Sequence, residues 1–366
     1  MVTMFHTVTN RHIVVVMKSG NAIIAHLGLQ HPIVQGPFGG GLSTVELTSL
    51  VSNLGGLGSF GAHSFAAEKI GDVVAAIRLK TSQPFAVNLW VSDDDTGQET
   101  VDPAVFDATY TAFEPWFREL GLDRPDPPSR YHPSFEQQFD ALLAARPPVF
   151  SFVFGIPDKH QLAACRARGI VTIGAATSVA EALAVDAAGV DMVVASGMEA
   201  GGHRPSFLSA AEDSLHGTFA LVQLVSARVA IPVIAAGGIA DARGVRAATM
   251  LGASAVQVGT AFLACAESGT DDRHRELLFS TEPGQTRLTR AFSGRLARGI
   301  RTAWTEQYWA RKEPASFPIQ SWFSGQLRQA ALTAGRTDLI SAWSGQIAPH
   351  LKHRRAADLM AALVAD

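Results

Sequence analysis

Residues 193–207, VVASGMEAGGHRPSF, place one histidine just beyond an apolar, strand-like run. The small residues 200–202 separate His203 from that run. A histidine side chain has an ordinary pKa close to neutral pH and can accept a proton there. A run of small residues lets a flat ligand approach the backbone closely. The stretch therefore predicts a base, His203, beside a loop that a planar ligand can reach.

Two further strand-like runs end in glycines. AAGGI contains Gly237 and Gly238, and QVGTAF contains Gly259 and Thr260. Backbone N–H groups at such turns, aided by the dipole of the following helix, hold anions, and a threonine hydroxyl adds a donor. Together the two loops predict a site for a phosphate-bearing ligand. The alternative, that Gly237 and Gly238 only form a tight turn, stays open.

Three other polar residues follow or lie within apolar runs. Glu199 either orients the loop before His203 or has a purely structural role. His63 is interpreted as structural. Asn88, in VNLW, is an amide on an apolar strand, and a buried amide needs hydrogen-bonding partners. Those partners are either other core groups or a flat heterocycle with donors and acceptors.

Apolar runs alternate with helix-like segments along the chain. Near-continuous apolar strands joined by helices are typical of a parallel sheet covered on both faces. This pattern predicts an α/β protein with a (β/α)8 TIM barrel, whose active site lies at the carboxyl ends of the strands. An open doubly wound sheet is the alternative, although no G-x-G-x-x-G follows the first strand. The predicted strands are residues 31–37, 56–62, 85–91, 149–155, 170–176, 191–197, 231–239 and 254–262.

Two regions fall outside the repeat of strand and helix. Residues 92–147 are polar, contain prolines and are mostly helix-like, which predicts a helical insertion after the third strand. Residues 270–366 are expected to form a C-terminal helical extension lying partly over the barrel mouth. This extension contains the similar segments WFSGQ and WSGQ. We expect a single domain over residues 1–366.

The composition excludes several classes of protein. Apolar residues make up 47% of the chain and charged residues 17%, which is typical of a globular enzyme. A net charge of −3 provides no basic field for nucleic acid or anionic lipid. No apolar run is long enough to span a membrane, and the two cysteines, Cys165 and Cys265, show no disulfide or metal-ligand spacing. We therefore expect a cytoplasmic protein without a metal, nucleic-acid or membrane partner.

Several motifs together resemble one known family. They are PIVQGPFGGGLSTVELTSLVSNLGGLGSFGA, PFAVNLWV, ASGMEAGGHR, IPVIAAGGIADARGV and GASAVQVGTAF. As a set they resemble the nitronate monooxygenases, formerly called 2-nitropropane dioxygenases. The resemblance covers residues 27–300, and any one motif alone would be weak.

The resemblance implies an FMN-dependent barrel that oxidises alkyl nitronates with O₂ to a carbonyl compound and nitrite. His203 corresponds to the family's catalytic base, which takes the α-proton of a nitroalkane. A nitronate or nitroalkane and O₂ would be the small-molecule partners, and a homodimer is possible. The flavin contacts correspond to Gly36, Pro37, Phe38, Asn88, Gly174, Ala175, Gly197, Gly201, Gly202, Gly237, Gly238, Gly259 and Thr260.

The sequence departs from the family pattern at three positions. Pro205 stands where a glycine is frequent, Ser196 where a glutamine is common, and Ala175 where some relatives have a lysine. These changes bear on the substrate and on flavin reactivity more than on flavin binding. The same superfamily contains flavin-type enoyl-ACP reductases and NADH:quinone reductases. An NAD(P)H-dependent flavin reductase is therefore the alternative, and a non-enzymatic barrel that binds a phosphate ligand is a third, less favoured hypothesis.

Overall fold

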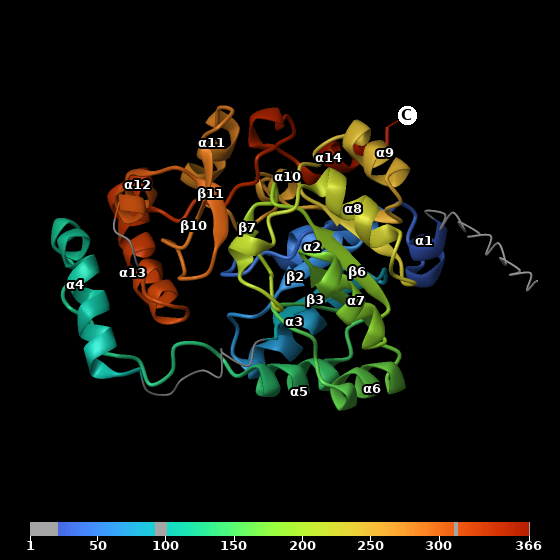
Figure 1. Cartoon of the computed structure of the whole chain (residues 1–366), viewed down its shortest axis with the longest axis horizontal. Helices are drawn as coiled ribbons and strands as arrows, with labels where there is room; N and C mark the ends of the chain where they lie inside the picture. Colours follow the sequence, from blue (N-terminus) through green and yellow to red (C-terminus); the bar gives the residue numbers. More distant parts are fainter. Residues whose placement is uncertain (1–20, 92–100, 311–313, 366) are drawn as a thin grey trace, which may run out of the picture.

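A closed ring of parallel strands forms the centre of the computed structural model, which describes residues 21–91, 101–310 and 314–365 (Figure 1). Each of the eight predicted strands has a counterpart in the sheet, whose order is β1-β9-β8-β6-β5-β4-β3-β2. A bridge between Val34 and Leu57 joins the first strand of this order to the last. The (β/α)8 prediction is confirmed and the open sheet is excluded. The strands are β1 (Ile33–Gln35), β2 (Gly58–Gly61), β3 (Phe85–Trp90), β4 (Val149–Val153), β5 (Val171–Ala176), β6 (Met192–Ser196), β8 (Val233–Ala236) and β9 (Ala255–Val258).

An outer helix follows each strand of the barrel. The last of them, α14, packs against both α2 and α9 and so completes the ring of helices. None of the described helices is long and apolar enough to cross a membrane. The outer helices are α2 (Val45–Asn53), α3 (Ala67–Lys80), α5 (Phe135–Ala145), α6 (Lys159–Ala167), α7 (Val179–Ala187), α8 (Thr218–Ser226), α9 (Ala242–Met250) and α14 (Ala356–Leu363).

Side chains alternate between the two faces of each barrel strand. In β3, Phe85, Val87 and Leu89 belong to the core between strands and helices, whereas Ala86 belongs to the core inside the barrel. This period of two follows from strand geometry, and burial on both faces explains why the strand sequences are almost continuously apolar.

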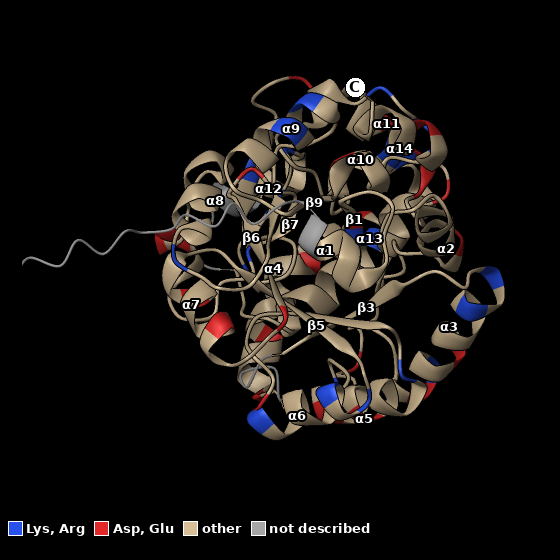
Figure 2. Ribbon diagram, turned by 90° about the vertical axis from the view of Figure 1, so that its right-hand side faces the viewer, with Lys and Arg blue, Asp and Glu red and all other residues tan. Residues whose placement is uncertain are grey.

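The helix α1 (Asn21–Leu27) closes the end of the barrel where the strands begin. Its Ile23 and Leu27 pack into the inner barrel core, with residues at the starts of strands such as Leu57 and Ala86. Figure 2 looks toward this end and shows α1 in front of the strands, with the outer helices around it. The opposite end, where the strands finish, is the barrel mouth.

The predicted insertion after β3 is helical, as expected, and its residues 92–100 lie outside the described part of the chain. The helix α4 (Pro103–Glu119) leaves the barrel and packs against α13 (Ile319–Ala334), at the left of Figure 1. Phe113 and Phe323 stack at this contact, with ring centroids 5.2 Å apart. The insertion and the C-terminal segment thus share one core.

The C-terminal segment contains strands as well as helices. Its helices are α11 (Asp272–Ser280), α12 (Ala303–Ala310) and α13, and the short α10 (Thr260–Leu263) precedes them. The strands β10 (Thr286–Thr289) and β11 (Ala297–Ile300) form a small antiparallel sheet with β7 (Gly202–His203). The sequence did not indicate these strands because they are too short to form apolar or alternating runs. The chain also returns to the barrel with α14, so much of this segment is inserted before the last barrel helix.

His274 joins α11 to the segment that precedes α14. Its side chain is fully buried, and its Nε2 donates to the carbonyl oxygen of Trp343 at 2.9 Å. Burial disfavours the charged imidazolium and lowers the pKa of His274 from its ordinary 6.5 to about 4.

We predict that His274 makes the protein less stable in acid. Between pH 6.5 and about 4 the unfolded chain binds a proton at this histidine and the folded chain does not. The free energy of unfolding therefore falls by about 1.4 kcal/mol per pH unit on acidification through this window, and this histidine adds no further loss below it. His274→Gln keeps a donor but does not titrate, so urea unfolding at several pH values should show a flatter dependence. Equal slopes in both proteins would contradict the prediction.

Candidate active site

The inner face of the barrel changes from apolar to polar toward the mouth. Above the apolar layer, the alternation of the strands points Asn88, Ser151, Ser196 and Gln257 inward. Asn88 is only 4% exposed, and its Nδ2 donates to Ser151 Oγ at 3.0 Å. No protein hydrogen bond of the described residues uses its side-chain oxygen. Asn88 is thus a buried amide whose nitrogen, but not its oxygen, has a protein partner.

His203 lies at this mouth and is held by a residue far away in the sequence. Its backbone pairs with Ala297 of β11, and its Nε2 is 2.7 Å from Ser293 Oγ. The rings of Trp90 and Trp343 lie 4.9 and 5.0 Å from the imidazole, measured between centroids. Ser293 was not predicted, because nothing in the sequence marks a serine 90 positions downstream of a histidine as its partner.

The surroundings of His203 keep its imidazole neutral. Burial, and then the nearby positive charge of Arg295, lower the pKa of His203 to about 3. The guanidinium carbon of Arg295 lies 4.0 Å from the ring centroid of Phe154, also at the mouth. At neutral pH His203 is therefore in the form that can accept a proton.

Glu199 hydrogen-bonds backbone and so orients the loop before His203, one of the two roles that its sequence position left open. Its carboxylate oxygens accept from the backbone N–H of Thr218, at 3.0 and 2.9 Å, and one of them accepts from the Thr218 hydroxyl at 2.8 Å. Thr218 is the first residue of α8, where backbone N–H groups lack partners within the helix. Glu199 thus ties the loop before His203 to the start of α8.

Arg204, next to His203, holds the other side of the same loop. Its guanidinium is 2% exposed and donates to the carbonyl oxygens of Ser196, Gly197 and Ser214 at 3.0, 2.7 and 2.9 Å. Burial lowers the pKa of Arg204 to about 10, so it remains charged at neutral pH. The sequence showed this arginine but not its anchoring function, because its acceptors are backbone atoms.

Three of the predicted glycine loops lie side by side because β1, β9 and β8 are neighbours in the sheet. The N–H of Gly36 donates to Val258 O at 2.9 Å, and a Cβ atom added to Gly36 would lie 3.2 Å from the Cα of Gly259. Gly237 and Gly238 have φ angles of +116° and +72°, which favour glycine. The structure thus brings these loops together, with Pro37, Phe38 and Thr260, while their contact with a flavin phosphate stays a prediction.

Other predicted contact residues have a different surrounding. A Cβ on Gly174 would lie 2.9 Å from Val185 of α7, so Gly174 faces the outer helices while Ala175 faces the barrel interior. A Cβ on Gly197 would lie 1.9 Å from Thr218 Oγ1, and one on Gly201 would lie 2.5 Å from the backbone nitrogen of Gly345. Packing within the protein is enough to require glycine at these three positions.

Gly202 is different, since its φ of +77° favours glycine and a Cβ there would meet nothing within 4 Å.

His63 is stacked on Trp90 with ring centroids 3.8 Å apart and an interplanar angle of 7°. Burial, His132 and His203 all lower the pKa of His63. His63 thus packs at the mouth, among the aromatic side chains that surround His203.

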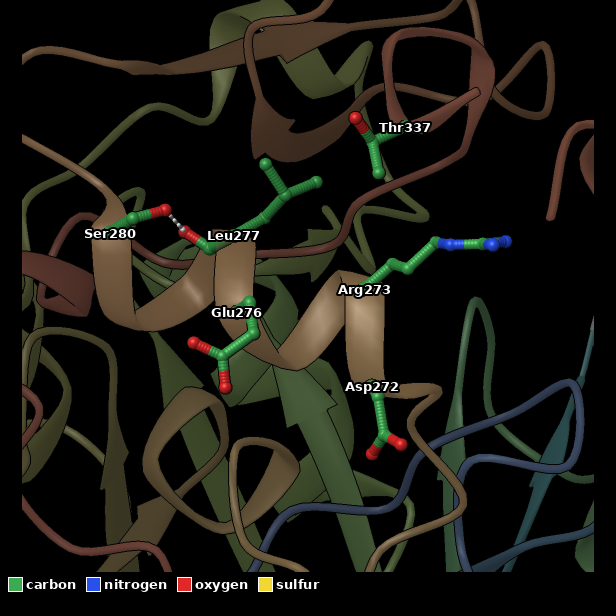
Figure 3. A pocket seen from close by; sticks show the side chains of 6 residues that line it. All are labelled: Asp272, Arg273, Glu276, Leu277, Ser280 and Thr337. Carbon is green, nitrogen blue, oxygen red and sulfur yellow. Dashed lines mark hydrogen bonds between the residues drawn. The ribbon is translucent and has the colours of Figure 1, made fainter. Parts of the chain in front are cut away.

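Two observations limit where chemistry can occur among the described residues. No cluster of three or more histidine, cysteine, aspartate or glutamate side chains there could hold a metal ion. A depression of about 310 Å³ lies on α11, where five of its six side chains spread along the helix without converging and Thr337 comes from a separate segment (Figure 3). It is lined by Asp272, Arg273, Glu276, Leu277, Ser280 and Thr337.

Comparisons with known proteins identify the family of the chain. The nitronate monooxygenase family model matches residues 21–366. The nitronate monooxygenase of Pseudomonas aeruginosa strain PAO1 is 41% identical over 346 residues, covering 92% of this chain and 96% of that protein. A nitroalkane oxidase from Streptomyces ansochromogenes superposes with a TM-score of 0.84 at 33% identity, covering 92% of this chain and 95% of its own.

FabK from Thermotoga maritima has the same fold with lower similarity. Its TM-score is 0.72 at 28% identity, covering 93% of this chain and 94% of that chain. The family match over nearly the whole chain and the 41% identity therefore decide the assignment. The chain is an oxidoreductase and belongs to the nitronate monooxygenase family.

Proposed function

We propose that the chain binds FMN at the barrel mouth and uses His203 as the base for oxidation of alkyl nitronates by O₂. The products are an aldehyde or ketone and nitrite. The observation that carries this proposal is the neutral His203, hydrogen-bonded to Ser293 and placed beside the glycine loops of the mouth.

The residues at the mouth suit both the flat ring system and the phosphate of FMN. The side-chain oxygen of Asn88 and the inward-facing amide of Gln257 can meet the donors and acceptors of a flat heterocycle. The loops at Gly237–Gly238 and Gly259–Thr260 suit the phosphate, because glycines let an anion approach the backbone closely, and Gly36 packs beside Gly259. When bound, FMN supplies the electron transfer between the nitronate and O₂.

His203 acts as a base on the neutral nitroalkane form of the substrate. The imidazole takes the α-proton, and the Ser293 oxygen can then accept from the protonated Nε2. The nitronate formed beside it is an anion, which favours the charged imidazolium that burial and Arg295 otherwise oppose. The positive charge of Arg295 likewise favours an anionic substrate at the mouth.

A flavin reductase that uses NADH or NADPH is the second candidate on the same barrel. The likeness to FabK supports it, because that protein shares the fold over 93% of this chain. The higher identity to a nitronate monooxygenase, 41% against 28%, favours the first candidate.

We predict that His203→Asn separates the two substrate forms. The variant cannot take the α-proton, so kcat/KM for nitroethane should fall about 100-fold or more. For ethyl nitronate, which is already deprotonated, the fall should stay within about tenfold, since only positioning is lost. His160→Asn, on the exposed face of α6, is the control and should change neither value. Equal losses on both substrates would exclude the base role.

The pH dependence provides an independent prediction. The base is active when neutral, and with a pKa of about 3 it stays neutral throughout the range from pH 5 to 7. Because kcat/KM reports the free enzyme, its value for neutral nitroethane should show no loss on acidification from pH 7 to pH 5. A tenfold fall per pH unit below about 6.5 would show that His203 titrates as an ordinary histidine.

A further inference from the structure

The segment WSGQ, residues 343–346, lies against two parts of the proposed active site. The N–H of Gly345 donates to Thr260 Oγ1 at 2.9 Å, and the N–H of Gln346 donates to Glu199 O at 2.9 Å. A Cβ added to Gly201 would lie 2.5 Å from the nitrogen of Gly345. The C-terminal segment therefore packs on the loop of Gly259 and Thr260, which we propose for the phosphate, and on the loop that carries His203.

Trp343 begins this segment, and its neighbours hold its indole beside the base. The ring centroid lies 5.0 Å from that of His203 and 4.8 Å from that of Phe292, which meets it edge to face. Its backbone pairs with Gly299 and accepts from buried His274. The side chain is only partly buried, so part of the indole surface is accessible.

The indole is one of several aromatic rings that surround His203. Trp90 lies 4.9 Å and Phe154 6.0 Å from the imidazole, between ring centroids. The carbon atom that gives its proton to His203 must lie within hydrogen-bonding reach of the imidazole. The alkyl chain on that carbon therefore extends among these rings.

We propose that Trp343 is a specificity-determining residue, whose indole forms the apolar wall against which the alkyl chain of the nitronate packs. This inference rests on the proposed function of His203. Its energetic basis is the burial of methylene groups, each of which strengthens binding about fourfold when fully covered.

The second similar segment, WFSGQ, supplies a matched control. Its tryptophan, Trp322, packs against Phe106, Tyr131 and Phe323 at ring-centroid distances of 5.9, 5.6 and 4.9 Å. Phe106 lies on α4 and Phe323 on α13, and none of these ring contacts of Trp322 involves His203, although Trp322 and Trp343 border the same core cluster. Trp322 and Trp343 are thus the same residue type, but only Trp343 has a ring contact with His203.

The test compares KM for ethyl, butyl and hexyl nitronates in the FMN-loaded wild type, Trp343→Ala, Trp343→Phe and Trp322→Phe. We expect KM to fall about threefold to fourfold per added methylene in the wild type and in Trp322→Phe. In Trp343→Ala this dependence should nearly vanish, and Trp343→Phe should restore most of it. If Trp343→Ala does not fold or does not retain FMN, Trp343→Leu replaces it with the same expectation of a weakened dependence.

An unchanged chain-length dependence in a folded, FMN-loaded Trp343 variant would overturn the proposal, as would an equal change in Trp322→Phe. Failure of the proposed function gives a different result, because the wild type itself would then consume no O₂ with any nitronate. In that case, quenching of indole fluorescence by the same nitronates still measures whether their alkyl chains bind against Trp343. Tighter binding of longer chains that is lost without Trp343 would support it, and equal binding in both proteins would overturn it.

Discussion

The position of His203 depends on three charged side chains, two buried and one partly buried, whose partners are mostly backbone groups. Arg204 binds three carbonyl oxygens before and after the histidine, and Glu199 binds the first N–H of α8. Glu181, also fully buried, accepts from the backbone of Thr177 and of Phe207 at 2.7 Å. Burying a charge without partners is strongly unfavourable, so each of these groups stabilises only the loop conformation that satisfies it. The loop after β6 is thereby fixed at the barrel mouth.

This fixed loop explains the electrostatic state of the base. A rigid backbone holds the imidazole among aromatic rings, where burial disfavours its charged form. The segment after α13 adds one of those rings and contacts the loop after β9 through Thr260. The C-terminal segment, which returns to the barrel only with α14, is thus part of the site as well as of the fold.

The sequence predicted the barrel well, because strands buried on both faces leave continuous apolar runs and glycines at their ends. It placed His203, Asn88 and the loops of Gly237 and Gly259 at one mouth, since parallel strands finish at the same end of a barrel. It did not reveal Ser293 or Trp343, whose approach to His203 depends on tertiary packing. Nor did the sequence show that Gly174 packs against an outer helix while other glycines face the mouth. The alternation of side chains along a strand tells which face a residue is on only once the register of the strand is known.

We propose that FMN bound at the mouth takes electrons from a nitronate. The absorption spectrum of the purified protein, recorded without O₂ and titrated separately with ethyl nitronate, NADH and NADPH, tests it most directly. The account predicts a flavin spectrum that ethyl nitronate bleaches and that neither reduced nicotinamide changes. A colourless protein that takes up no FMN, or bleaching by NADH or NADPH but not by the nitronate, would contradict it.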